Sequence, residues 1–377
     1  MQRQSDGIRV GVVGVGYWGS RHVRVLRSTT GVAMVIGVDE RFTGKTGEPQ
    51  QVDCDVPGYA SLEDALPAVD AVVIATPPSS HYSLGLQAIE AGKHVLIEKP
   101  LAASLSEATA LVNAAEAAGT VLMPGLTFLY NAAVHKLRDV VRSELGTLYY
   151  LDGERLNLGL YQPDVNVVSD LAPHDISIAN FVLDSRPTTV SAWGSRYVHP
   201  RHEDVAHLRL DYSDVGVTAN IHVSWLNPHK VRRITAVGSR KMAVYDEMAA
   251  DERIRVYDKF AMSPQESSGP LSRVAYHFGD VVAPFIDFAE PLAVQDQDFV
   301  NCVIDGRAPS TNGHHGLAVV EVLECAQISL QEQRPVAVAE LTRVRSGPAR
   351  DSAPPALDGS ASGEEDAFAG TRITPTR

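Results

Sequence analysis

Apolar runs and stretches of helical periodicity alternate through the first third of the chain. Five short runs rich in Val, Ile and Ala predict buried strands, at residues 8–13, 33–38, 71–75, 94–97 and 121–123. Between them, helical patterns are expected at 20–26, 81–91 and 105–118. Strands that alternate with helices in this way indicate a parallel, doubly wound α/β sheet.

The pattern changes after residue 128, where strands dominate. Runs rich in β-branched and aromatic residues predict strands at 148–156, 188–196, 207–212, 217–225, 233–238 and 336–339. Helices are expected at 132–143, 176–183, 296–305 and 314–332. Short connections favour antiparallel neighbours. Residues 346–377 are rich in Ser, Gly, Ala and Pro, so we expect a first domain at 1–128, a second at 129–345 and a disordered tail.

Composition narrows the class of protein. The 377 residues suffice for two domains, and a net charge of -13 argues against a nucleic-acid binder or an anionic-membrane binder. Three widely spaced cysteines, Cys54, Cys302 and Cys325, match no zinc pattern and are expected to be reduced, so no metal is predicted. The sequence shows no signal-peptide pattern or membrane-spanning run, which favours a cytoplasmic protein.

A glycine-rich turn follows the first predicted strand. Gly14, Gly16 and Gly19, with Tyr17 and Trp18 between them, form a G-x-G-x-x-G pattern. Such glycines permit a tight strand-to-helix turn, close approach of a pyrophosphate and close helix packing, with the helix N-terminus facing the anion. The alternative is a plain tight turn. The strand that follows, which ends at an acidic residue, favours the dinucleotide site.

That acidic residue, Asp39, bears on which dinucleotide is bound. It lies roughly 20 residues beyond the glycine turn, the offset expected for a carboxylate that binds the ribose hydroxyls of NAD. It would repel the 2′-phosphate of NADP, although Arg41 can pair with that phosphate instead. We therefore predict NAD, with NADP as the alternative.

Candidate catalytic residues lie where a substrate would meet the nicotinamide. Glu98, Lys99 and Pro100 directly follow a buried strand, and a lysine there can bind a substrate hydroxyl; the alternative is a solvated lysine. Beyond the boundary, Asp170 and His174 lie one helical turn apart. His174 can take the substrate proton, and Asp170 can orient His174 or bind a substrate hydroxyl, with Asp175 as the rival acid partner. The alternative is an N-capping aspartate and a structural histidine, with Pro173 in the first helical turn.

Together these motifs resemble the glucose–fructose oxidoreductase / inositol dehydrogenase (Gfo/Idh/MocA) family. The resemblance runs from about residue 8 to 339, nearly all of the chain expected to be ordered, and rests on the glycine turn, residues 75–78 with His81, residues 92–95 leading into Glu98-Lys99-Pro100, and Asp170 with His174. It implies an N-terminal Rossmann domain, and a C-terminal α/β domain whose large, open, mainly antiparallel sheet commonly forms dimer or tetramer contacts. It places the catalytic lysine at Lys99, with Asp170 and His174 as partners. Thr76, Pro77, His81 and Glu98 would then lie near the cofactor.

The substrate is less sharply indicated. Arg155, Asn157, Tyr161 and Asn166 are expected to approach the cleft. A basic and aromatic cluster that can hold phosphate follows, although it can equally be an exposed turn: Trp225, His229, Lys230, Arg232 and Arg233. Residues 170–177, 224–230 and 238–246 resemble the family's nucleotide-sugar branch, which often acts at carbon 3.

The predicted function is NAD-dependent hydride transfer at a secondary hydroxyl of a nucleotide-linked or phosphorylated sugar. The alternatives are a free polyol or inositol dehydrogenase, an NADPH-dependent keto-sugar reductase, and a non-catalytic NAD-sensing protein.

Overall fold

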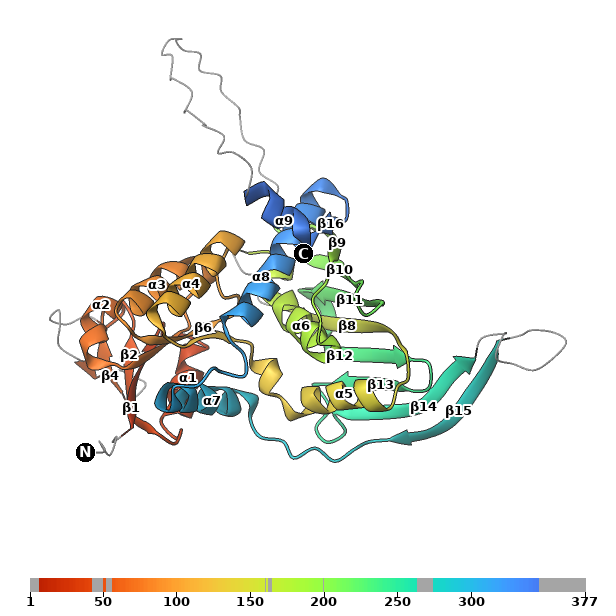
Figure 1. The fold of residues 1–377 in the computed structure, drawn as a ribbon, viewed down its shortest axis with the longest axis horizontal. Helices are drawn as coiled ribbons and strands as arrows, with labels where there is room; N and C mark the ends of the chain where they lie inside the picture. Colours follow the sequence, from red (N-terminus) through yellow and green to blue (C-terminus); the bar gives the residue numbers. More distant parts are fainter. Residues whose placement is uncertain are drawn as a thin grey trace, which may run out of the picture.

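Two sheets lie side by side in the computed structural model, which describes residues 7–42, 50–51, 56–159, 161, 165–198, 200–262 and 274–345 (Figure 1). The predicted tail at 346–377 and Cys54 lie outside the described residues. The N-terminal third of the chain builds one sheet, and the chain then passes to the other.

The first sheet is the predicted Rossmann sheet. Over the described residues it has seven strands in the order β3-β4-β2-β1-β5-β6-β7, all parallel except the β3–β4 pair. Its strands are β1 (Ile8–Val13), β2 (Val32–Val38), β3 (Gln50–Gln51), β4 (Pro57–Tyr59), β5 (Ala71–Ile74), β6 (His94–Glu98) and β7 (Leu122–Gly125). The central strands β1, β5 and β6 are buried on both faces, which explains their nearly continuous apolar runs.

Helices cover both faces of this sheet. They are α1 (Gly19–Leu26), α2 (Leu62–Ala65), α3 (His81–Glu90) and α4 (Leu105–Ala118), with single 3₁₀ turns η1 (Leu66–Ala68), η2 (Pro78–Ser80) and η3 (Thr127–Tyr130). The α4 helix begins at the side-chain cap of Ser104 and ends at Gly119, whose positive φ terminates it. The strand–helix alternation predicted from the sequence is confirmed here.

The second sheet has nine strands among the described residues, in the order β15-β14-β13-β12-β8-β11-β10-β9-β16. All neighbours are antiparallel except β8 and β11. Its strands are β8 (Leu148–Leu158), β9 (Thr189–Ser195), β10 (Val205–Tyr212), β11 (Val217–Ser224), β12 (Leu226–Gly238), β13 (Met242–Asp246), β14 (Ile254–Met262), β15 (Ala275–Val282) and β16 (Val336–Ala337). The large, mainly antiparallel sheet is as expected.

Several boundaries differ from the sequence prediction. The last predicted strand, at 336–339, is only the two-residue β16, and the chain continues as α9 (Val338–Arg345). The strands β13, β14 and β15 were not predicted. In Figure 1, β14 and β15 extend away from the rest of the molecule as a long hairpin.

The helix that carries the candidate catalytic pair is longer than predicted. α6 (Val167–Leu183) begins well before residue 176, and Pro173 lies in its interior rather than its first turn. The cap is Asn166, whose side chain accepts a hydrogen bond from the Ser169 backbone N–H. Asp170 is therefore not the cap. α6 packs on one face of the second sheet, and α5 (Ala132–Ser143) packs beside it.

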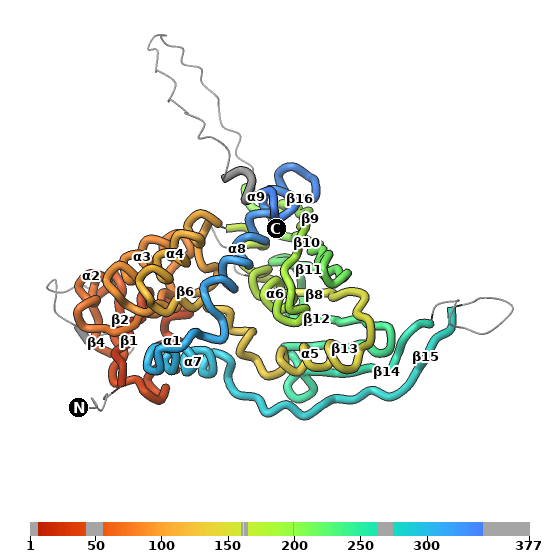
Figure 2. The backbone as a smooth tube through the Cα atoms, in the orientation of Figure 1, coloured from red at the N-terminus to blue at the C-terminus, as the bar shows by residue number. Residues whose placement is uncertain are grey.

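Two helices near the end of the described chain pack back onto helices of the first sheet. α7 (Pro291–Asp305) lies against α1, and α8 (Gly313–Glu332) packs between α4 and α6 (Figure 2). Phe299 and Val300 of α7 belong to the same apolar cluster as Val10 and Val12 of β1. The domain division at residue 128 remains a prediction, and residues beyond it complete the first sheet's cover. In the described part of the chain, no helix has both the length and the apolar character to cross a membrane.

Candidate active site

The glycine turn connects β1 to α1 at the carboxyl end of the first sheet. Gly14 has a φ of 82°, and a Cβ on Gly19 would lie 1.9 Å from the Gly14 carbonyl oxygen, so no larger residue fits at either position. Gly16 has open space where a Cβ would stand. Tyr17 and Trp18 are exposed beside it. This cradle fits a pyrophosphate at the start of α1.

Asp39 stands at the end of β2, next to the glycine turn. Its Oδ2 accepts the Val15 backbone N–H at 2.9 Å, and both carboxylate oxygens accept hydrogen bonds from the exposed guanidinium of Arg41. The bonds from Arg41 hold the pKa of Asp39 below its usual value, so the carboxylate is ionised at neutral pH. An ionised acceptor at this position fits the ribose hydroxyls of a dinucleotide.

The loop after β5 lies beside the glycine turn because β1 and β5 pair in parallel. The Thr76 methyl group lies where a Gly14 Cβ would point, and Pro77 is exposed. His81 has a different place from the one predicted. It is fully buried, and its ring nitrogens lie 2.8 Å from the Pro100 carbonyl oxygen and 2.9 Å from that of Thr76. It joins these two loops through its ring, and its predicted contact with the cofactor stays a prediction.

Lys99 follows β6 and reaches across to α6. Its Nζ donates to the Asp170 carbonyl oxygen at 2.8 Å and lies 3.3 Å from Asp170 Oδ1. Asp170 Oδ2 accepts from Trp225 Nε1 at 3.0 Å. Trp225 is buried and supports Asp170, which corrects its predicted role as a substrate contact. Asp170 thus pairs with Lys99, whereas the sequence suggested that it orients His174.

His174 lies one turn along α6 with a different environment. Its Nδ1 is buried without a hydrogen-bond partner among the described residues, and its ring meets Phe128 edge-on at 4.9 Å. Burial lowers the pKa of His174 well below its usual value, and the positive charges of Lys99, Arg155 and Arg232 add to this effect. The imidazole is therefore neutral at physiological pH and can accept a proton.

Arg155 and Asp175 form a buried pair behind this site. Arg155 Nε donates to Asp175 Oδ2 at 2.6 Å, and its guanidinium lies 4.7 Å from the Phe128 ring centroid. Arg155 is 2% exposed. It supports the Phe128 ring that contacts His174, which corrects its predicted contact with substrate. Asp175 is committed to Arg155 and does not orient His174.

The other predicted substrate residues lie in different places: some are near Trp225, one caps α6, and two are exposed. Tyr161 packs against Trp225 with ring centroids 5.2 Å apart, and Asn157 is partly exposed nearby. Arg232 is partly buried and lies 3.9 Å from Glu247. Asn166 is buried as the α6 cap and also donates to Glu203, so it is structural. His229 and Lys230 are exposed, and no described contact joins either to the site.

Sequence reasoning missed a buried histidine on α1. His22 Nδ1 lies 3.0 Å from Asp296 Oδ2 of α7, and its Nε2 lies 3.1 Å from Glu98 Oε1 of β6. All three residues are buried. Glu98 therefore contacts His22, and its predicted place near the cofactor stays a prediction. The nearest available signal was a histidine on the apolar face of the helix, three residues after Gly19.

Comparison with protein families decides the class. A family described as an oxidoreductase family with an NAD-binding Rossmann fold, Gfo/Idh/MocA, matches residues 8–126, and the C-terminal domain of the same family matches residues 135–244. The chain belongs to the Gfo/Idh/MocA family. It is a dehydrogenase of this oxidoreductase family, and the sequence resemblance is confirmed. Among the described residues no cluster of His, Cys, Asp or Glu is arranged to hold a metal ion.

Characterised Gfo/Idh/MocA members match along most of the chain. The UDP-N-acetylglucosamine 3-dehydrogenase of Acidithiobacillus ferrooxidans is 27% identical over 318 residues, which are 83% of this chain and 94% of that protein. Its crystal structure has a TM-score of 0.70 at 25% identity, covering 86% and 98% of the two chains. The Bacillus subtilis scyllo-inositol 2-dehydrogenase (NAD(+)) is 25% identical over 350 residues, 87% and 96% of the two.

A structure described as GenD2 from gentamicin A biosynthesis in complex with NAD shares the fold. Its TM-score is 0.71 at 24% identity, over 89% of this chain and 97% of that one.

Proposed function

We propose that the chain is an NAD-dependent dehydrogenase that acts on a secondary hydroxyl of a nucleotide-linked or phosphorylated sugar. The observation that carries the proposal is the Lys99–Asp170 contact, which joins the carboxyl end of the Rossmann sheet to α6 beside a neutral His174. The first matched relative, which acts on a UDP-linked sugar, supports the substrate class.

The Lys99 ammonium is suited to bind the reacting oxygen. It has three N–H donors, and two of them face the carbonyl oxygen and Oδ1 of Asp170. The third is left for a substrate hydroxyl. A positive charge at this point stabilises the negative charge that develops on the oxygen as its proton leaves. Asp170 fixes the direction of the ammonium, and Trp225 fixes Asp170.

His174 is suited to move the hydroxyl proton. Its depressed pKa keeps the ring unprotonated at neutral pH, as a general base requires. When bound, the nicotinamide accepts or supplies the hydride. The protein residues therefore have to hold the carbinol carbon at the nicotinamide and carry the proton. Lys99 does the first by binding the hydroxyl oxygen, and His174 does the second.

The test compares Lys99→Ala and His174→Ala with the wild type on UDP-sugars, dTDP-sugars, free sugars and inositols, followed as NADH absorbance. Each variant is expected to lose about 10²–10⁴-fold in kcat while NAD binding, measured by titration calorimetry, stays within about threefold. Near-wild-type rates for both variants contradict the assignment. Turnover of free inositols alone favours the polyol dehydrogenase. Reduction of keto sugars with NADPH alone favours the reductase, and NAD binding without turnover of any compound favours the sensor.

The preference for NAD has its own test at Asp39. The Asp39→Ala variant removes the acceptor for the ribose hydroxyls and the negative charge that repels a 2′-phosphate, while the positive charge of Arg41 stays beside the site. The ratio of kcat/KM for NAD to that for NADP is expected to fall at least tenfold. A variant with the wild-type ratio shows that Asp39 does not select the cofactor.

A further inference from the structure

The buried His22 is flanked by two carboxylates. Asp296 Oδ2 lies 3.0 Å from its Nδ1, and Glu98 Oε1 lies 3.1 Å from its Nε2. Burial raises the pKa of Asp296, whereas the hydrogen bond from His22 helps to lower that of Glu98. With both carboxylates ionised they only accept hydrogen bonds, so both ring nitrogens donate and the ring is an imidazolium. Its two neighbours raise the pKa of His22 to about 10, against the opposing effect of burial.

Glu98 links His22 to Lys99, the proposed catalytic lysine. Its Oε2 accepts the backbone N–H of Lys99 at 3.2 Å, while Oε1 faces His22. On the other side, a Cβ on Gly125 of β7 would stand 3.0 Å from Glu98 Oε1. The Glu98 carboxylate is thus held between α1, β7 and the first peptide of the lysine loop.

We propose that His22, held by Asp296, is a positioning residue for Lys99. By fixing Glu98, the imidazolium fixes the end of β6, and so the direction in which Lys99 Nζ meets Asp170 and the substrate oxygen. This inference rests on the proposed catalytic role of Lys99. His22 is also part of α1, whose first turn faces the predicted pyrophosphate.

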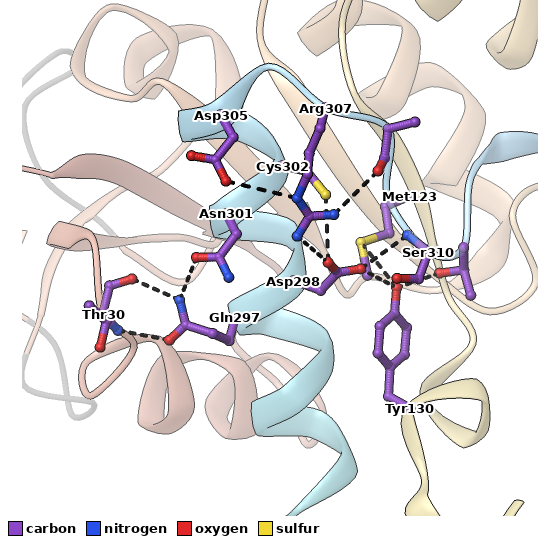
Figure 3. A network of polar contacts seen from close by, with 12 residues as sticks. Thr30, Met123, Tyr130, Gln297, Asp298, Asn301, Cys302, Asp305, Arg307 and Ser310 are labelled. Carbon is purple, nitrogen blue, oxygen red and sulfur yellow. Dashed lines mark hydrogen bonds and ion pairs between the residues drawn. The ribbon is translucent and has the colours of Figure 1, made fainter. Parts of the chain in front are cut away.

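The attachment of α7 does not require this charged group. Figure 3 shows the neighbouring contacts, in which Gln297 exchanges two hydrogen bonds of 3.0 Å with the Thr30 backbone, and Tyr130 donates to Asp298 at 3.0 Å. Phe299 and Val300 add apolar packing. Burying an ion pair in place of apolar side chains is often neutral or destabilising. The packing of α7 on the first sheet therefore gives no reason for three buried ionisable groups at this point.

The experiment compares two changes in the triad with a matched change on α7. His22→Gln and Asp296→Asn weaken the triad, whereas Gln297→Ala removes both bonds to Thr30 and leaves the triad intact. In the full-length enzyme, both triad variants are expected to lose about 10- to 100-fold in kcat, because a displacement near 1 Å of a catalytic group costs up to about 10²-fold. KM and the NAD dissociation constant are expected to stay within about threefold. Gln297→Ala is expected to lower the melting temperature and keep kcat.

A structural measurement avoids dependence on turnover. In a crystal structure of Asp296→Asn, which is isosteric and still accepts a hydrogen bond, the 2.8 Å contact from Lys99 Nζ to the Asp170 carbonyl oxygen is expected to lengthen beyond about 3.5 Å. If His22→Gln does not fold, the kcat and the crystal structure of Asp296→Asn alone test the inference.

The inference is overturned if Asp296→Asn keeps this contact and wild-type kcat. It is also overturned if Gln297→Ala, at a similar loss of melting temperature, loses as much kcat as Asp296→Asn. A large loss in Lys99→Ala then leaves the proposed function standing. If Lys99→Ala also keeps its activity, the proposed function itself fails.

Discussion

Asp170 presents its two carboxylate oxygens to different partners, Lys99 and Trp225. Lys99 could be predicted as a site residue because a charged side chain directly after a buried strand needs a partner or a use. The contact of Trp225 with Asp170 could not be predicted, because the residue after β11 meets α6 only once the second sheet has packed. His22 escaped prediction for the same reason, since its carboxylates lie 76 and 274 residues away.

The charge on His22 predicts a specific dependence of stability on pH. A histidine whose folded pKa is raised stabilises the protein fully below its unfolded value of 6.5, and the contribution is lost as the pH rises toward about 10. Asp296 and Glu98 face the ring, and Lys99 acts on the Glu98 carboxylate. Between pH 7 and 10, the free energy of unfolding, measured in urea, is expected to fall more steeply for the wild type than for His22→Gln. Parallel slopes contradict a protonated His22.

At the scale of elements, apolar periodicity predicted the strands and helices wherever one face or both are buried. It failed on β14 and β15, because most β15 residues are at least partly exposed and no buried face marks the strand. It also placed the start of α6 too late. Pro173 suggested a first turn, whereas the helix continues through it from the Asn166 cap.

The Asn166 cap gives a prediction for α6. Its side chain accepts from Ser169 N–H at 3.1 Å and donates to Glu203 at 2.9 Å. Asn166→Ala is expected to lower the free energy of unfolding by about 1–2 kcal/mol, measured by urea denaturation, because the cap is lost and Glu203 loses a donor. Asn166 lies one helical turn before Asp170, the residue that Lys99 contacts. NAD binding is therefore expected to be unchanged. A cost below about 0.5 kcal/mol would show that the helix start is held by other contacts.

At the scale of the whole molecule, one face of the second sheet is not covered by any helix of the described residues. α6 packs on the other face. A row of side chains crosses the strands of the open face, and Trp193, His207 and His222 stack along it with ring centroids 5.4 and 4.0 Å apart. Trp193 is 58% exposed. An aromatic row of this kind supports the expectation that copies of the chain associate through this face.

Trp193 tests that expectation. Trp193→Asp is expected to convert the predicted dimer or tetramer to a smaller species at micromolar concentration, as measured by size-exclusion chromatography with light scattering. Trp193→Phe keeps an aromatic ring and serves as the control that retains the assembly. A wild type that is monomeric, or a Trp193→Asp protein of unchanged mass, contradicts association through this face.

The return of α7 to the first sheet has a consequence for how the protein is made. Val10, Val12 and Leu26 share an apolar cluster with Phe299 and Val300. The first sheet is complete at residue 125, whereas α7 ends at residue 305. At about 5–20 residues per second, a ribosome finishes the sheet on the order of tens of seconds before the helix that covers it exists. During that interval the nascent sheet carries a bare apolar strip. The predicted dinucleotide-binding sheet is synthesised first, but its apolar cluster is complete only when α7 has been made.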